Sequence, residues 1–179
     1  MFLIHTIVLI VFGLTGTFED RIAVSYIEEF RDLAIIEMHR SGIPASITLA
    51  QGMHESAYGK SPLAMYANNH FGIKCKSYWR GDTYYHKDDD TDQQGQLIDS
   101  CFRSYESAIA SYVDHSNFLM KSSHYQWLFS FDHTDYESWA HGLKKSGYAT
   151  DPAYAEKLLV KIHKYGLDQY DHWDLTGLR

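Results

Sequence analysis

One glutamate and one cluster of aspartates are the strongest candidates for chemistry in this sequence. Glu55 lies in an otherwise apolar stretch, and Asp88, Asp89 and Asp90 follow in a polar segment. Breaking a glycosidic bond requires a carboxylic acid that stays protonated near neutral pH. It also requires a second group that holds a water molecule or supports the developing positive charge. A lone glutamate and a separate carboxylate cluster can divide these tasks. The alternative is that Glu55 pairs with a cation and the aspartates form a solvated hairpin tip.

Two metal-binding motifs begin at the same residues, and both are incomplete. His54 and Glu55 open the H-E-x-x-H pattern of zinc proteases, but its fifth position is Tyr58. The acidic run that starts at Asp88 begins like a calcium loop, but Gln93 stands where the loop needs its turn glycine. The 11 histidines show no other ligand spacing. The sequence therefore predicts no bound metal and no cofactor.

Glu55 is expected near the C-terminal end of a buried helix. Pro44 suits the first turn of that helix, apolar residues recur at helical spacing after it, and Gly59 ends it. At a helix C-terminus the dipole disfavours negative charge, and apolar neighbours disfavour it further. The position therefore predicts a raised pKa for Glu55.

Further helices are expected on both sides of a small β lobe. Glycines punctuate short β-prone pieces between residues 71 and 102. Helical spacing of apolar residues, with caps and stops, predicts helices over residues 25–40, 106–120, 125–129 and 136–145, and a last one from Asp151-Pro152 to Tyr165. The pattern predicts a mainly α-helical domain with a small β-hairpin lobe.

Composition limits the classes of protein and partner. A chain of 179 residues has room for one domain. A formal net charge of −7 without a run of Lys or Arg disfavours nucleic acid, because phosphate binding needs clustered cations. The 14 Tyr and 4 Trp suit a groove that stacks rings against sugars, although core packing explains most such residues. No obligate protein partner is indicated, and we expect a monomer.

The N-terminus has the length of a signal-peptide core. Residues 2–12 are almost wholly apolar and are too short for a relaxed membrane span, although no Lys or Arg precedes them. A retained anchor or a buried core segment are the alternatives. We expect residues 1–17 to be a signal peptide or anchor, residues 22–172 to form the catalytic domain, and the protein to be exported to the periplasm or beyond the cell.

The two cysteines, Cys75 and Cys101, bracket the expected β lobe. An even cysteine count in an exported chain favours one disulfide. Two unpaired buried thiols are the alternative.

Several motifs, in order along the chain, resemble a known enzyme family. The longest is residues 43–56, IPASITLAQGMHES, followed by residues 59–64, GKSPLA, and 68–74, NNHFGIK. Later matches are residues 101–105, CFRSY, 114–116, DHS, and 146–155, SGYATDPAYA. Together they resemble the bacterial endo-β-N-acetylglucosaminidases of glycoside hydrolase family 73, over about residues 25–170.

The resemblance implies a lysozyme-like fold, a peptidoglycan glycan strand as substrate, and Glu55 as the catalytic acid. It also implies that Tyr148 reaches the cleft opposite this acid and that Asn69 and Phe71 line the cleft floor. The second catalytic carboxylate then falls in the 88–90 cluster, with Asp89 preferred by its spacing from Glu55 and Asp90 as the next candidate. Ten residues separate Asp90 from Cys101, so this hairpin is longer than the family pattern implies. Each of these three binding residues also has a purely structural alternative. Tyr148 and Phe71 can be core residues, and Asn69 can cap a turn.

Two other functions compete with glycan hydrolysis. An N-acetylmuramoyl-L-alanine amidase would need zinc ligands or a Cys/His pair, and the sequence offers neither convincingly. A non-catalytic sugar-binding module would keep an aromatic cleft but would have no use for a buried acid. The presence of Glu55 favours the hydrolase.

Overall fold

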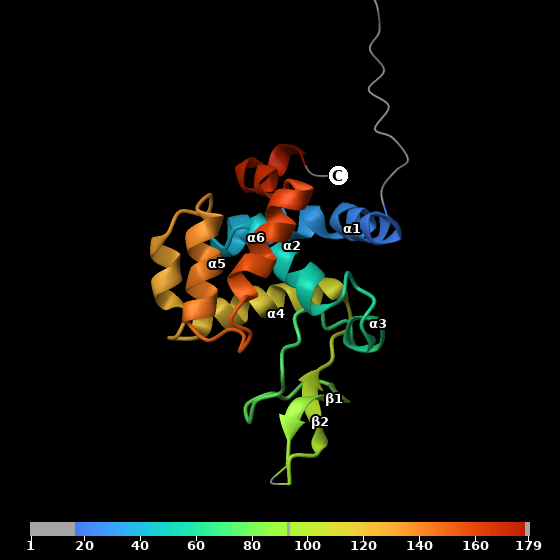
Figure 1. The fold of residues 1–179 in the computed structure, drawn as a ribbon. Coiled ribbons are helices and arrows are strands. Elements are labelled where there is room, and N and C mark those ends of the chain that lie inside the picture. The colour runs from blue at the N-terminus through green and yellow to red at the C-terminus, as the bar shows by residue number, and fades with distance from the viewer. Residues whose placement is uncertain (1–16, 93, 178–179) are drawn as a thin grey trace, which may run out of the picture.

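The computed structural model describes residues 17–92 and 94–177 as a helical body with one projecting β-hairpin (Figure 1). The longer helices and the strands are α1 (Phe18–Ser41), α2 (Ala45–Glu55), α3 (Pro62–Ala67), β1 (Thr83–Thr91), β2 (Leu97–Arg103), α4 (Ala108–Lys121), α5 (Tyr136–Lys145) and α6 (Tyr154–Tyr165). Short 3-10 helices are η1 (Gln126–Ser130), η2 (Leu167–His172) and η3 (Leu175–Gly177). The mainly helical prediction with a small β lobe is confirmed.

Helix α2 is the centre of the core. Every residue from Ala45 to Met53 is buried, as expected of a helix that is surrounded on all sides. Helices α1, α5 and α6 and the 3-10 helix η2 pack around it (Figure 1). Asp171 of η2 accepts hydrogen bonds from the Ser46 backbone N–H at 2.8 Å and from its hydroxyl at 2.6 Å. The N-terminus of α2 is thus held from the far end of the chain.

Helix α1 begins earlier than its apolar spacing predicted. Thr17 caps it: the Thr17 hydroxyl accepts from the Asp20 N–H at 3.2 Å, and the Asp20 carboxylate accepts from the Thr17 N–H at 3.0 Å. This reciprocal capping box satisfies two N–H groups that a helix start otherwise leaves free. The predicted leader, residues 1–17, lies outside the described residues except for Thr17.

The hairpin carries the acidic cluster on an irregular stretch of its first strand. Strands β1 and β2 pair antiparallel, with Lys87 opposite Asp99 and Thr91 opposite Leu97. Three residues, 88–90, therefore oppose Ile98 alone, and the register shifts between them. Bulges of this kind bend a strand and redirect its residues, and they are frequent next to active sites.

A disulfide joins the hairpin to the segment that leads into it. Cys75 and Cys101 are bonded, with Cα atoms 5.4 Å apart. Beside the bond, Lys74 bridges Phe102, and the Cys75 N–H donates to the Cys101 carbonyl at 2.8 Å. The base of the lobe is therefore fixed to the preceding segment by a covalent bond and by backbone hydrogen bonds.

Two helix predictions need correction. Helix α3 was not predicted, because six residues are too few to show periodicity; Ser61 caps it and Pro62 occupies its first turn. The last helix begins at Tyr154 instead of Asp151, because the Asp151 carboxylate accepts from the Ala153 N–H at 2.9 Å and forms a turn first. Among the described residues, no helix combines the length and the apolar character needed to cross a bilayer.

Candidate active site

Glu55 is the last residue of α2, at the point where the buried helix reaches a pocket. The helix ends abruptly because the next residues turn left-handed: φ is +49° at Ala57, +56° at Tyr58 and +76° at Gly59. Left-handed backbone costs energy for residues with a side chain and tends to occur at functional sites. The Ser56 hydroxyl secures the turn by donating to the Gly52 carbonyl at 2.5 Å and accepting from the Gly59 N–H at 2.7 Å. This turn fixes the direction of the Glu55 carboxyl group.

A tyrosine from the far end of the chain orients the Glu55 carboxyl group. The Tyr154 hydroxyl donates to Glu55 Oε1 at 2.9 Å and accepts from Gln51 Nε2 at 3.0 Å. Gln51 lies one turn before Glu55 on α2, and Tyr154 is the first residue of α6. Both residues are buried, so the carboxyl group has a fixed partner on one oxygen.

Opposing effects act on the charge of Glu55, and burial is the largest of them. Burial raises the pKa of Glu55 above its ordinary value, and the negative charge of Asp88 adds to that rise. The hydrogen bond from Tyr154 and the positive charge of Lys161 lower the pKa. Lys161 is itself half-buried, and burial lowers its own pKa. The net direction is upward, as predicted for an acid at the end of an apolar helix.

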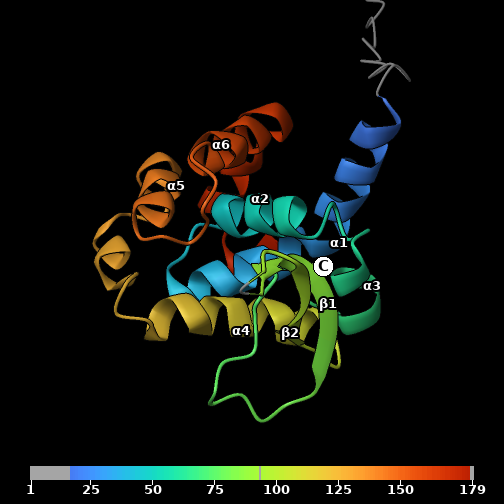
Figure 2. The same cartoon turned by 60° about the horizontal axis from the view of Figure 1, so that its bottom comes forward.

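The pocket beside Glu55 has a volume of about 250 Å³ and lies between the helical body and the base of the hairpin. Its walls combine aromatic rings with two lysines; they are formed by Glu55, Phe71, Gly72, Ile73, Lys74, Lys76, Phe118, Tyr125, Tyr148 and Ala149. Tyr148 stacks on Tyr154 with ring centres 5.6 Å apart. Flat rings beside an oriented acid form a surface suited to a sugar ring. Figure 2 shows the hairpin in front of the helical body.

Three predicted binding residues occupy different positions. Phe71 and Tyr148 line the pocket with Glu55. Phe71 is 3% exposed and stacks on His115 with ring centres 4.0 Å apart, so it is a core residue that also forms part of the wall. Asn69 lies behind the wall.

The side chain of Asn69 supports the loop that forms the pocket floor. Asn69 is 1% exposed, and its amide donates to the carbonyls of Ile73 and Arg103 at 3.1 and 2.8 Å. Its side-chain oxygen accepts from the N–H groups of Phe71 and Ile73 at 3.3 and 3.1 Å. This side chain holds Phe71 in place from behind.

The acidic cluster faces the site through at least one of its members. Asp88 pairs with Lys74 of the pocket wall at 3.0 Å, and its charge acts on Glu55. Asp89 and Asp90 belong to β1 on the bulged stretch, and only their backbone lies in the described part of the chain. In the part of the chain that the structure describes, no group of three or more His, Cys, Asp or Glu side chains is placed to hold a metal ion.

Sequence reasoning did not assign roles to Tyr154 and Lys74. Both stand in motifs that carry the family resemblance, NNHFGIK and SGYATDPAYA, and this is the signal that could have found them. Their partners are distant in sequence: Tyr154 reaches across 99 positions to Glu55.

A family model described as mannosyl-glycoprotein endo-beta-N-acetylglucosaminidase matches residues 31–167, which is most of the chain. The chain belongs to this glucosaminidase family. The family resemblance expected from the motifs is confirmed, and with it the lysozyme-like helical fold.

Curated members of the glucosaminidase family resemble this chain over most of its length. The exo-glucosaminidase LytG of Bacillus subtilis is 30% identical over 186 residues, covering 96% of this chain and 65% of that protein. The peptidoglycan hydrolase FlgJ of Vibrio cholerae is 29% identical over 140 residues, covering 75% of this chain and 41% of that protein. The chain thus spans about two fifths to two thirds of the length of these relatives.

A solved autolysin structure shows the same fold. The catalytic domain of the autolysin Auto from Listeria monocytogenes superimposes with a TM-score of 0.73 at 27% identity, covering 89% of this chain and 91% of that domain. The helical body and hairpin described above are therefore the architecture of this family.

Proposed function

We propose that this protein hydrolyses the glycan strands of bacterial peptidoglycan after N-acetylglucosamine, with Glu55 as the general acid. The observation that carries the proposal is the half-buried Glu55 carboxyl group, oriented by Tyr154 at the wall of an aromatic pocket. The name of the matching family supports the N-acetylglucosamine specificity. The names of LytG and FlgJ support a glycosidase that acts on peptidoglycan.

The geometry suits proton donation by Glu55. Tyr154 donates to Oε1, which leaves Oε2 to carry the acidic proton toward the leaving glycosidic oxygen. As the proton leaves, the carboxylate that forms keeps its hydrogen bond from Tyr154. The positive charge of Lys161 also stabilises this carboxylate. The raised pKa keeps the acid protonated in a larger fraction of molecules near neutral pH.

The second carboxylate in this proposal comes from the 88–90 cluster. Asp89 remains our first choice and Asp90 the second, and the bulge places both on the stretch of β1 that carries Asp88. Such a carboxylate would activate a water molecule or stabilise the positive charge at the sugar carbon. A hairpin that projects from the body is suited to close over the strand only when the strand is bound (Figure 1).

A second hollow beside the first pocket supports a substrate of several sugars. Phe118 lines the pocket beside Glu55 and also a second hollow of about 580 Å³, whose walls include Tyr78, Trp79 and Lys121. A strand that passes Phe118 would therefore extend from the first pocket into this hollow.

The family match does not favour amidase chemistry. Both cysteines are joined in a disulfide, so neither serves as a thiolate nucleophile. We further propose that the protein is exported, works as a monomer and meets its substrate in the periplasm or outside the cell, because peptidoglycan lies there.

Mass spectrometry of a digest of purified sacculi tests the function. We expect new reducing ends at N-acetylglucosamine, with long oligosaccharides appearing before disaccharides. Reducing ends at muramic acid would identify a muramidase, and free stem peptides without new reducing ends would identify an amidase. Disaccharides from the start of the reaction would show cleavage from strand ends.

A further inference from the structure

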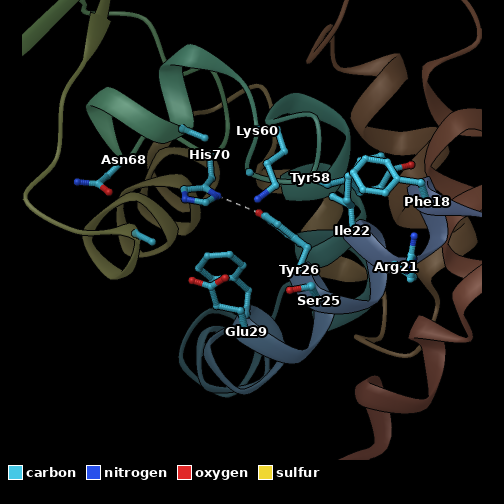
Figure 3. Close-up of a pocket in the computed structure, with 14 residues that line it drawn as sticks. Phe18, Arg21, Ile22, Ser25, Tyr26, Glu29, Tyr58, Lys60, Asn68 and His70 are labelled. Atoms are coloured by element: carbon cyan, nitrogen blue, oxygen red, sulfur yellow. Dashed lines mark hydrogen bonds between the residues drawn. The ribbon is translucent and has the colours of Figure 1, made fainter.

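A third pocket, of about 500 Å³, is lined in part by the turn that follows Glu55 and shares no lining residue with the candidate active site. It is enclosed by the N-terminal half of α1, the turn at residues 58–60, α3 and the first residue of α4. Figure 3 shows its lining, with Lys60 and His70 on one side and Glu29 and Ser25 on the other. No side chain of this pocket contacts the glycan in the hydrolysis proposed above.

A buried chain of hydrogen bonds ends at this pocket. The hydroxyls of Tyr112 and Tyr26 lie 2.9 Å apart, and the Tyr26 hydroxyl lies 3.0 Å from His70 Nδ1 (Figure 3). Burial lowers the pKa of His70 to about 4, so its ring is neutral at neutral pH and carries one N–H. A phenol is a stronger acid than a neutral imidazole N–H, so Tyr26 donates to Nδ1. We therefore assign the ring proton to Nε2.

His70 Nε2 is a donor that the protein leaves open. It has no hydrogen-bond partner among the described residues, and unlike the ring nitrogens of His115 it is not sealed from solvent. A neutral donor at a pocket wall selects an oxygen acceptor, such as a carbonyl or a carboxylate.

Charged side chains of both signs line the same pocket. The Lys60 amine extends toward the hydrogen bond between Tyr26 and His70, and Glu29 lies across the pocket from it (Figure 3). Both side chains belong to exposed residues, and neither forms a salt bridge with a described residue. Between them the wall is apolar and partly small, with Phe30, Ala64 and Ala108. The pocket thus offers a cation and a donor on one side, an anion on the other, and room for methyl groups between.

We infer that this pocket binds a short peptide that carries a free carboxylate and, on a residue close to it in the peptide, a free ammonium group. The carboxylate would meet Lys60 and the Nε2–H of His70, and the ammonium group would meet Glu29. Small side chains between the two charges would pack against Phe30 and the two alanines. Peptide stems of peptidoglycan have this chemistry, with alanines beside a diamino acid, so the identity of the peptide rests on the proposed function.

Helix α2 and the turn that follows it pack closely against Tyr26 of this pocket. A Cβ atom on Gly52 would lie 2.5 Å from the Tyr26 hydroxyl, and one on Gly59 would lie 3.3 Å from the Tyr26 ring. Glu55 lies between these two glycines in the sequence and lines the active-site pocket. A glycan strand in that pocket and a peptide stem in this one would therefore both lie next to the end of α2.

Binding of Nα-acetyl-L-lysyl-D-alanyl-D-alanine to the full protein tests the inference. We expect calorimetric binding and a shift of the His70 ring signals in NMR spectra. The C-terminal amide of the probe should bind about tenfold more weakly to the wild type, as should the Nε-acetyl form, because each loses one charge-assisted contact. Lys60→Met should weaken the free acid about tenfold but leave the affinity for the amide nearly unchanged. Glu29→Gln should weaken binding of the free-amine probe about tenfold but leave the affinity for the Nε-acetyl form nearly unchanged.

The matched controls are Glu28→Gln, the exposed neighbour of Glu29 on α1, and Lys145→Met on α5, and both should bind as the wild type does. Absence of binding at millimolar probe, equal affinity for all three probes, or shifts at Tyr148 in place of His70 would each overturn the inference. Sacculus clearing is scored on the same preparation. Clearing without probe binding would contradict the peptide pocket but not the proposed hydrolase activity. Probe binding without clearing would support the pocket and contradict the hydrolase activity.

Discussion

Glu55 owes its chemistry to the residues that surround one carboxyl group. Burial at the end of α2 and the charge of Asp88 favour the protonated form, while Tyr154 and Lys161 favour the carboxylate. An acid in this balance can give up its proton during the reaction and regain it afterwards. The Tyr154 hydrogen bond, at 2.9 Å, also determines which oxygen is free to donate.

Glu55→Gln should remove nearly all of the 10²–10⁴-fold acceleration that general acid catalysis typically supplies, measured as clearing of purified sacculi. The same variant should be as stable as the wild type near pH 7, or more stable. The raised folded pKa means that the native carboxylate costs stability once the pH rises past the unfolded value. Thermal unfolding at pH 7 checks the second part. Full clearing by this variant would overturn the assignment of Glu55.

Tyr154→Phe should move the alkaline limb of the pH–rate profile to higher pH. The lost hydrogen bond stabilises the carboxylate, so its removal raises the pKa of the acid. The rate should also fall, because Oε1 loses its orienting partner and buried Gln51 Nε2 loses its acceptor.

Two further variants show whether the shift from Tyr154→Phe is specific. Tyr165→Phe, at the other end of α6, should leave the alkaline limb of the pH–rate profile at its wild-type pH. Asp88→Asn should move the limb to lower pH, since the charge of Asp88 raises the pKa of Glu55. Shifts of the same sign in Tyr154→Phe and Asp88→Asn would contradict the electrostatic account.

Local patterns predicted Glu55 but not its partners. The apolar spacing before Gly59 placed the acid at the end of a buried helix, and that helix position alone implied the direction of its pKa. The contact with Tyr154 joins residues 99 positions apart, so it depends on how α6 packs on α2. Asn69 shows the same limit, since its motif indicated importance but not that its side chain serves the loop backbone.

At the scale of elements, the hairpin combines a fixed base with an irregular strand. The disulfide and the pairing of Lys74 with Phe102 hold the base, while the register shift falls on the stretch with the aspartates. Composition and turn residues predicted a β lobe here. They could not predict the bulge, because register depends on which residues of the partner strand face residues 88–90.

Asp89→Asn should leave measurable activity, because Asp88 and Asp90 lie on the same irregular stretch and either can supply a carboxylate in its place. The measurement is sacculus clearing by the single variant beside the triple variant, in which all three aspartates become asparagine and clearing should stop. Asp99→Asn on β2, opposite Lys87, serves as the control and should clear sacculi normally. Complete loss in the Asp89 variant would show that this carboxylate is unique.

At the scale of the whole molecule, the end of the chain holds the start of the catalytic helix. Asp171 reaches across 125 positions to Ser46 at the N-terminus of α2 and is 1% exposed. Burial is the largest influence on this carboxyl group, and it raises the pKa of Asp171 to about 6. Helix α2 is therefore secured by η2 at one end and by Tyr154 of α6 at the other.

Asp171→Asn should flatten the dependence of stability on pH. A folded pKa of about 6 against a reference value of 3.8 means that this group costs stability as pH rises from roughly 4 to 6. Asparagine carries no charge and keeps an oxygen that can accept from the Ser46 N–H. Melting temperatures between pH 4 and pH 7 check this, with Asp168→Asn on the same 3-10 helix as the control. A variant with the same pH slope as the wild type would contradict the raised pKa.

The missing side chain of Gly52 has a consequence for the evolution of the protein. A single methyl group there would meet the Tyr26 hydroxyl at 2.5 Å and the Tyr112 hydroxyl at 3.1 Å. Tyr26 has little room to retreat, because it is 3% exposed and its hydroxyl is tied to Tyr112 and His70. A side chain at this position would therefore displace Tyr26 and disturb its hydrogen bonds with Tyr112 and His70. In a saturation library selected for wall lysis, position 52 should be as intolerant as the acid itself, although its residue has no functional group.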